Sequence, residues 1–495
     1  MDSREEVKQD HRMEEGQGRL PYLDTLVAYS QEETTHFDVP GHKQGRGIPI
    51  LRECYGMQVL RMDLNGPPRL DHLAHPQTVL REAKTLMADA YGADEAFLIT
   101  SGTTCAIHAM MLAALQPGDK VLLPRNIHKS AINGLILTGA IPIYLEADFL
   151  PQEGIMGNVS LTEVQKKLGQ HPDAKAIFLL NPTYYGFTAP LQDIVSLCHQ
   201  QGLLVLVDEA HGAHFPFHRD LPLSAMAAGA DLAAVSLHKT GGAMTQASIL
   251  LVNQSRISAA KVEQTVSLLH STSPSALLLG SLDGARQNLA LHGREQLEKA
   301  LALALDCRKR LTEIEGIYPL WPQDLTKIPI NVTGLGLSGF EVFELMWRQF
   351  NIELEMGDMG NVLAIISLGD HLGAINQLVD AFQHLSAHRV PAAKHEPDPY
   401  LARIEPVVVL SPRDAFFSQK ILVPITDAAG YLAGESIMAY PPGSPLVAPG
   451  EQVTAALIET LLHFKSSGAR LIGQYDPLLD YLLVLKDIFP LLPEV

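Results

Sequence analysis

Apolar residues change their spacing repeatedly between residues 76 and 252. From Val79 to Ala90 they recur at helical spacing, and Gly92 is placed to end that helix. Short runs that are apolar almost throughout alternate with such helical segments and predict strands at 96–100, 120–124, 141–145, 176–180, 205–208 and 247–252, with one more leading to Ser236. Strands of this kind, interleaved with helices, are typical of a mainly parallel sheet covered on both faces. We therefore predict an α/β fold.

The remaining segments predict a multidomain chain. Residues 255–315 have the apolar spacing of long helices, and 328–385 resemble a second, small α/β unit. The stretch 390–399 has linker composition, whereas 146–160 gives no clear pattern and is expected to be a variable loop. With 495 residues, the chain is too long for one ordinary core. We expect four parts: an N-terminal segment with a glycine-rich loop and a flexible tail over 1–20 (1–60), a large domain (61–300), a small α/β domain (301–390) and a C-terminal domain (391–495).

Composition narrows the class of protein. The formal charge of −18 disfavours nucleic acids and anionic membranes as partners, because both would repel the surface. No apolar run is long enough to cross a membrane. The four cysteines have no metal-ligand spacing, so we expect neither a metal site nor disulfides, and a reducing, cytoplasmic location.

Two strand-end residues carry the strongest chemical signal. One apolar run ends at Asp208, and the other leads to Lys239. An arbitrary Asp and Lys are more often a structural ion pair than a site. In the alternative interpretation, Lys239 binds pyridoxal 5′-phosphate as a Schiff base and Asp208 keeps the pyridine nitrogen protonated.

A phosphate-binding turn is predicted at Ser101-Gly102-Thr103-Thr104. It lies between a strand and a helix, where free backbone N–H groups and hydroxyls can hold an anion. Taken alone, the same four residues would more often be a plain helix cap. A phosphate turn, an acid and a lysine in this order favour a cofactor enzyme over unrelated features.

At this point the chain resembles the Orn/Lys/Arg decarboxylases, a family of fold-type I pyridoxal-phosphate enzymes. The resemblance rests on these motifs: Pro40-Gly41-His42-Lys43, Ser101 to Thr104, Arg125 to Ser130, Asp208-Glu209-Ala210-His211, Ser236-Leu237-His238-Lys239, Thr245-Gln246-Ala247-Ser248, Ser271 to Ser275 and Tyr440-Pro441-Pro442-Gly443. It implies a PLP-dependent transferase-like large domain with the aspartate aminotransferase fold and a mainly parallel seven-stranded sheet. The implied reaction is decarboxylation of arginine or lysine, with ornithine as a third substrate, to agmatine, cadaverine or putrescine.

The resemblance also assigns roles around the cofactor. It makes Lys239 the Schiff-base lysine and Asp208 the partner of the pyridine nitrogen, with His128 stacked on the ring and His211 near its phenolic oxygen. The expected phosphate contacts are Ser101, Gly102, Thr103, Thr104, Ser236 and His238. Lys239 or His238 is the expected proton donor to the substrate.

Two further assignments concern the neighbouring subunit and the substrate. Thr272 or Ser273 is expected to reach the phosphate of a neighbouring subunit, which implies a homodimer, or a dimer-based oligomer, with shared sites. A basic side chain needs an acidic partner, for which Glu435 is the first choice and Asp358 and Glu355 are weaker choices; for each, a solvated surface carboxylate is the competing interpretation.

The chain also departs from the family pattern. Only about 20 to 40 residues precede the glycine-rich loop, so the large rings of family members with an N-terminal wing domain are not expected. Ala276 and Ser444 replace an aromatic residue and an isoleucine. Another fold-type I enzyme, such as an aminotransferase or aldolase, and a non-catalytic cofactor-binding regulator remain alternatives.

Overall fold

A computed structural model describes residues 16–388, 405–440, 443–466, 470–473 and 475–486. The predicted linker at 390–399, most of the predicted N-terminal tail and the prolines of Tyr440-Pro441-Pro442-Gly443 lie outside the described residues. Contacts divide the chain into two compact units, residues 1–113 with 207–298 and residues 114–206 with 299–495. None of the described helices is both long and apolar enough to cross a membrane.

The principal sheet confirms the predicted α/β fold with a mainly parallel, seven-stranded sheet. Its strand order is β1-β9-β8-β7-β6-β2-β3. Strand β2 pairs in parallel with β3 and β6, whereas β9 runs antiparallel to β1 and β8. The bounds are β1 Glu95–Ile99, β2 Lys120–Pro124, β3 Ile141–Leu145, β6 Ala176–Leu180, β7 Leu204–Asp208, β8 Leu232–Val235 and β9 Ser248–Val252. Almost every residue of these strands is buried except in β3, which explains their unalternated apolar sequences.

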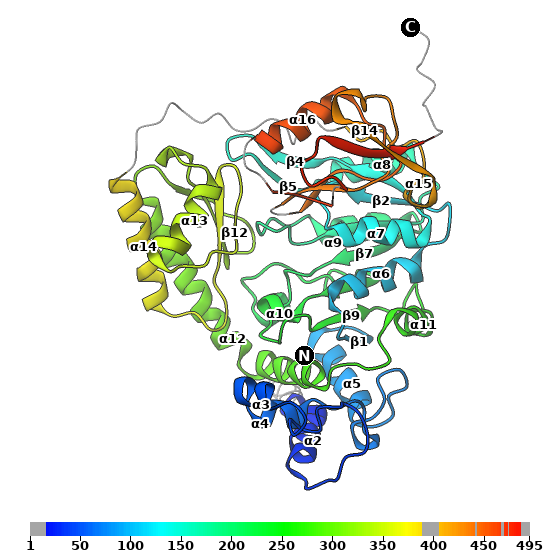
Figure 1. Cartoon of the computed structure of the whole chain (residues 1–495), viewed down its shortest axis with the longest axis vertical. Coiled ribbons are helices and arrows are strands. Elements are labelled where there is room, and N and C mark those ends of the chain that lie inside the picture. Colours follow the sequence, from blue (N-terminus) through cyan, green and yellow to red (C-terminus); the bar gives the residue numbers. More distant parts are fainter. Residues whose placement is uncertain (1–15, 389–404, 441–442, 467–469, 474, 487–495) are drawn as a thin grey trace, which may run out of the picture. The chain divides into compact units, whose positions relative to one another are not determined.

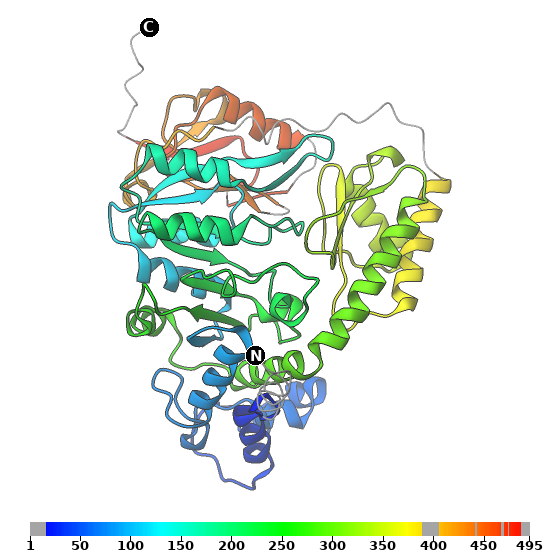
Figure 2. The ribbon, with the colours of Figure 1, turned by 180° about the vertical axis from the view of Figure 1, so that it is seen from behind.

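Helices in the second unit cover both faces of its strands. Helix α7 (Lys129–Thr138) lies in front in Figure 1, whereas α8 (Leu161–Gln170) and α9 (Leu191–Gln200) lie in front when the molecule is seen from behind in Figure 2. The Ser160 hydroxyl begins α8 by accepting a hydrogen bond from the Glu163 N–H at 3.2 Å. The predicted variable loop is instead partly a hairpin, with β4 Ala147–Leu150 and β5 Ile155–Val159. Asp148 in β4 and Gly157 and Asn158 in β5 interrupt the apolar runs, and these residue types are uncommon in strands.

A second sheet forms a separate core in the same unit. It has four antiparallel strands in the order β10-β11-β13-β12, and α13 and α14 pack against it (Figure 1). Their bounds are β10 Tyr318–Pro319, β11 Lys327–Asn331, β12 Met356–Gly357, β13 Asn361–Ile365, α13 Gly339–Phe350 and α14 Leu372–Ala387. Helix α13 begins with a capping box in which Ser338 and Glu341 satisfy each other's backbone N–H groups.

The described residues of the C-terminal part form two small sheets and a helix around one apolar cluster, and a second helix contributes Ala415 to another cluster. The bounds are α15 Pro412–Phe417, β14 Lys420–Pro424, β15 Ile437–Tyr440, β16 Ser444–Val447, α16 Ala455–Ser466, β17 Arg470–Ile472 and β18 Tyr481–Leu485. Arg125, which follows β2, binds Glu451 with both terminal guanidinium nitrogens, and Glu451 is 3% exposed. Bidentate, buried pairing of this kind fixes geometry as well as charge.

In the first unit, helices α2 (Pro21–Gln31), α3 (Pro49–Tyr55), α4 (Met57–Met62) and α5 (Val79–Tyr91) gather beside one another (Figure 1). Helix α5 has the predicted bounds and ends at Gly92, which has a φ of +66°. A left-handed residue at this position is most easily supplied by glycine. The remaining helices include α6 (Gly102–Ala114), α10 (Leu237–Thr240), α11 (Ala259–Leu269) and α12 (Ala276–Thr312).

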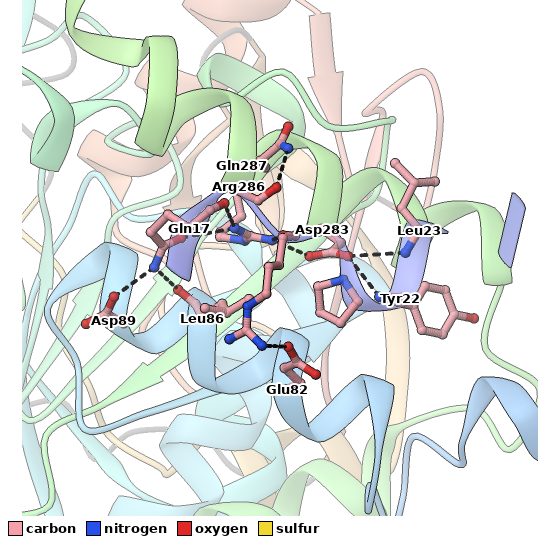
Figure 3. Close-up of polar contacts among 12 residues, drawn as sticks. Gln17, Tyr22, Leu23, Glu82, Leu86, Asp89, Asp283, Arg286 and Gln287 are labelled. Carbon is pink, nitrogen blue, oxygen red and sulfur yellow. Dashed lines mark hydrogen bonds and ion pairs between the residues drawn. The ribbon is translucent and has the colours of Figure 1, made fainter. Parts of the chain in front are cut away.

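A buried ion pair holds the N-terminal segment against α12 (Figure 3). Asp283 and Arg286 are 2.7 Å apart and have fully buried side chains. Arg286 also donates to the backbone carbonyls of Gln17 and Arg19. The second oxygen of Asp283 accepts from the N–H groups of Tyr22 and Leu23, the first turn of α2. A residue distant in sequence therefore supplies the N-terminal cap that α2 lacks locally.

Candidate active site

Asp208 is the last residue of β7 and only 2% exposed. Its Oδ1 accepts a hydrogen bond from the Ala210 N–H at 3.1 Å. Burial raises the pKa of Asp208 from 3.8 to about 6, although the positive charge of Lys239 and the Ala210 N–H oppose the rise. A carboxylate in this position favours any cation that can lie against it.

Lys239 lies beside a histidine in the same unit. It does not stand at the end of β8 but in α10, the single helical turn that follows, with Ser236 at the N-cap position. Its Nζ is 2.7 Å from Nε2 of His211, a side chain that is 4% exposed. The structure thus brings together Asp208, His211 and Lys239, all three of which were predicted from the sequence.

The hydroxyl groups of Thr103, Ser236 and Ser248 lie close together at the predicted phosphate turn. Gly102 has a φ of +75°, and α6 begins there. Thr103 Oγ1 is hydrogen-bonded to Ser236 Oγ and, at 2.7 Å, to Ser248 Oγ. Ser248 was not assigned a role from the sequence, although it closes the quoted motif Thr245-Gln246-Ala247-Ser248. Its signal is its place as the first residue of β9, an apolar strand.

The other predicted cofactor residues differ in their exposure to solvent. Ser101 is half-buried and Thr104 is exposed. His238 is half-buried, its Nδ1 lies 3.0 Å from the Ala247 carbonyl oxygen, and burial lowers its pKa. Both Thr272 and Ser273 are exposed, as a contact with another subunit would require.

The segment that precedes Thr272 is attached to the phosphate turn. His270 Nε2 accepts a hydrogen bond from the Thr100 N–H at 3.3 Å. Burial lowers the pKa of His270, which favours the neutral ring that this bond requires. Sequence reasoning missed His270, because a single histidine after a helix has no pattern that would distinguish it.

His128 belongs to the second unit. It is exposed and forms the N-cap of α7, where its Nδ1 accepts a hydrogen bond from the Ser130 N–H at 3.2 Å. Its Nδ1 is also 2.8 Å from the Ser130 hydroxyl oxygen.

The three candidate acids for the substrate differ in their partners. Glu435 is 7% exposed, its two oxygens accept from the backbone N–H groups of Tyr475 and Leu483, and burial raises its pKa. Asp358 accepts from the Tyr185 hydroxyl and from the N–H groups of Gly360 and Asn361. Glu355 is exposed and accepts from the Tyr184 hydroxyl. Asp358 therefore stabilises a local turn. Each Glu435 oxygen accepts one backbone hydrogen bond and has a second lone pair with which it can accept another.

The residues of the first unit fit pyridoxal phosphate. A small hydroxyl cluster beside a helix start suits a phosphate group, the Lys239 amine suits an aldehyde, and the buried Asp208 suits a protonated pyridine nitrogen. Among the residues that the structure describes, no three His, Cys, Asp or Glu side chains are grouped to hold a metal ion.

Comparison with known proteins gives matches along most of the chain. Residues 20–352 match the Orn/Lys/Arg decarboxylase major domain, and residues 400–474 match the C-terminal domain of the same family. The chain is 39% identical to an arginine decarboxylase of Bacillus anthracis and 38% identical to one of Bacillus subtilis. The first alignment covers 96% of this chain and 99% of the relative, and the second covers 95% and 99%.

The solved constitutive lysine decarboxylase of Escherichia coli has the same fold, with a TM-score of 0.82 over 95% of this chain and 82% of that one, at 19% identity. The two family domains and the aligned relatives agree in the reaction class. This chain therefore belongs to the Orn/Lys/Arg decarboxylase family and is an enzyme that decarboxylates basic amino acids.

Proposed function

We propose that this enzyme is a pyridoxal-phosphate-dependent arginine decarboxylase that converts arginine into agmatine and carbon dioxide. The observation that carries the chemistry is the grouping of Lys239, Asp208 and the Thr103 hydroxyl cluster in one unit. The choice of arginine is supported by the two Bacillus relatives named arginine decarboxylases, which align from end to end.

The cofactor would be held at three points. The Lys239 amine would bind the aldehyde carbon, and Asp208 would pair with the ring nitrogen. Thr103, Ser236 and the backbone N–H groups at the start of α6 would bind the phosphate. His238, Ser101, Gly102 and Thr104 complete the proposed phosphate surroundings, and His128 is proposed to stack on the ring. When bound, pyridoxal phosphate supplies an electron sink for the electrons of the breaking Cα–carboxylate bond.

Asp208 has one task in this scheme, which is to remain negatively charged opposite a protonated nitrogen. Its buried position strengthens that interaction, because a nearby charge is screened less in a low-dielectric site. Lys239 and His238 are the groups proposed to return a proton to the substrate Cα. They are consecutive residues in α10.

Glu435 is the proposed partner of the arginine guanidinium. A buried cation requires a negative partner, and a carboxylate can accept two parallel N–H bonds from a guanidinium. The backbone bonds from Tyr475 and Leu483 would hold the carboxylate in place.

We also propose a cytoplasmic homodimer in which Thr272 or Ser273 contacts the phosphate of the partner. None of the four cysteines is in a disulfide, and three of them are buried.

The test is to incubate the purified enzyme with pyridoxal phosphate and, separately, with arginine, lysine and ornithine, and to identify the amine and the carbon dioxide released. We expect agmatine from arginine as the main product, and no product from a Lys239→Ala variant. Preferred release of cadaverine or putrescine would instead identify lysine or ornithine as the preferred substrate. A keto acid formed without carbon dioxide would favour an aminotransferase and contradict the proposed reaction.

A further inference from the structure

His211 is a base in direct contact with the reactive amine. Its Nε2 lies 2.7 Å from Lys239 Nζ, within hydrogen-bond distance. The histidine side chain is 4% exposed, whereas Lys239 is exposed. A buried ring has few orientations, so it can hold the end of a long, otherwise flexible side chain at one place.

The pair has a chemical use because a free lysine is protonated near neutral pH. An ammonium group has no lone pair and cannot attack a carbonyl carbon. A histidine in contact can accept the proton at physiological pH, since its ordinary pKa lies near neutrality. A Lys239 ammonium can only donate a hydrogen bond, so at the 2.7 Å contact it would face an unprotonated Nε2, which is the form of the ring that can take a proton.

The geometry points to His211 as the proton acceptor that activates Lys239 for covalent attachment of the cofactor. This inference rests on the proposed function, because it requires pyridoxal phosphate as the aldehyde. The Lys239 ammonium gives one proton to His211 Nε2, and the freed nitrogen lone pair forms a bond to the aldehyde carbon. Loss of one water molecule, in which the aldehyde oxygen leaves, then gives the carbon–nitrogen double bond. No oxidant or reductant is consumed.

Asp208 is a poorer acceptor for this proton. It is the negative group whose charge the site must keep for the pyridine nitrogen, and its Oδ1 already accepts a hydrogen bond from the Ala210 N–H. His214, which is 1% exposed, has its Nδ1 3.0 Å from the Thr240 hydroxyl. It is a buried histidine that contacts Thr240 of the same helical turn, not Lys239 through this bond, and is therefore a matched control.

The experiment follows attachment of pyridoxal 5′-phosphate to the cofactor-free protein by the growth of the visible absorption band. Borohydride trapping and intact mass then count the loaded chains. His211→Ala should load about a hundredfold more slowly than the wild type, the lower end of general acid–base effects. His211→Gln, which retains a hydrogen-bonding group near Nε2 but is not a base, should also load slowly. Imidazole in the buffer should restore the rate of the alanine variant, and His214→Asn should load at the wild-type rate.

Two results would overturn the inference. One is a wild-type loading rate in His211→Gln, which would reduce His211 to a positioning residue. The other is a slow alanine variant that imidazole does not accelerate. Failure of the wild-type protein to bind pyridoxal phosphate would instead refute the proposed function, and this inference with it. A wild type that loads and decarboxylates arginine, while the His211 variants load normally, would refute only the role of His211.

Discussion

At the scale of single residues, burial gives the site its chemical character. Asp208 is placed where its charged form is disfavoured in the absence of a cationic partner, and burial raises its pKa to about 6. The folded, cofactor-free chain therefore retains a proton between pH 3.8 and 6 that the unfolded chain has released. Above pH 6 the buried carboxylate is charged and lowers the free energy of unfolding.

Replacing Asp208 with asparagine should remove this penalty. We expect cofactor-free Asp208→Asn to be more stable than the wild type at pH 8, by at most about 3 kcal/mol at ~1.4 kcal/mol per pKa unit. The difference should shrink as the pH falls from 6 towards 4. Thermal unfolding of both proteins across this range measures it, and a difference that does not depend on pH would contradict the assignment. The same variant should lose decarboxylase activity despite its stability.

Glu435 carries the prediction for substrate binding. Glu435→Gln would leave the arginine guanidinium without its charged partner, which costs roughly 2–5 kcal/mol in a buried site. We expect kcat/KM for arginine to fall about a hundredfold, which steady-state kinetics can measure. Glu355→Gln and Asp358→Asn are the competing variants. A larger loss in either of them than in Glu435→Gln would move the distal acid to that residue.

At the scale of elements, the ends of helices and strands agree with the sequence prediction where nearby residues determine them. Helix α5 ends at Gly92 because glycine readily adopts the left-handed conformation, and β2 and β6 keep their predicted bounds because their apolar runs stop abruptly. Helix α2 is different, because its cap comes from Asp283, which also binds the buried Arg286. That attachment has no local signal.

Removing this cap should destabilise the fold strongly. Asp283→Ala leaves the buried Arg286 without its anionic partner. It also removes the carboxylate that accepts hydrogen bonds from the first N–H groups of α2 (Figure 3). We expect a loss of roughly 3–5 kcal/mol in the free energy of unfolding, as for other broken buried pairs. Denaturant unfolding checks this. Glu344→Gln, which removes an exposed pair with Arg348, is the control and should cost less than about 1 kcal/mol. Equal losses in the two variants would argue against the role of Asp283.

At the scale of the whole molecule, the proposed dimer shares its sites. The exposed Thr272 and Ser273 come after a segment that His270 attaches to the phosphate turn of the same chain. A residue that we propose to serve the partner is thus connected to the phosphate turn of its own chain. Subunit exchange tests the sharing directly.

We expect Lys239→Ala and a Thr272→Val/Ser273→Ala double variant each to be nearly inactive. After the two are mixed under conditions that exchange subunits, each mixed dimer regains one intact site. For random pairing in a symmetric dimer, activity should recover to about a quarter of the wild-type value. Mixing each variant with itself is the control. No recovery, despite mixed dimers detected by mass, would show that these hydroxyls serve their own subunit or no site.

The sequence by itself determined the α/β class and most strand and helix positions, because burial on both faces and turn chemistry leave local patterns. The same patterns predicted Asp208 and Lys239 as site residues, and the family resemblance added His211. The hairpin β4–β5, the role of Ser248 beside Thr103 and the attachment of Gln17 to Arg286 were decided only by tertiary structure. Each of these depends on groups that are far apart in the chain or, for the hairpin, on strands whose apolar runs are interrupted by Asp148, Gly157 and Asn158. The contact between His211 and Lys239 combines both levels: the residue types can be read from the chain, but their 2.7 Å separation results from where β7 and α10 end in space.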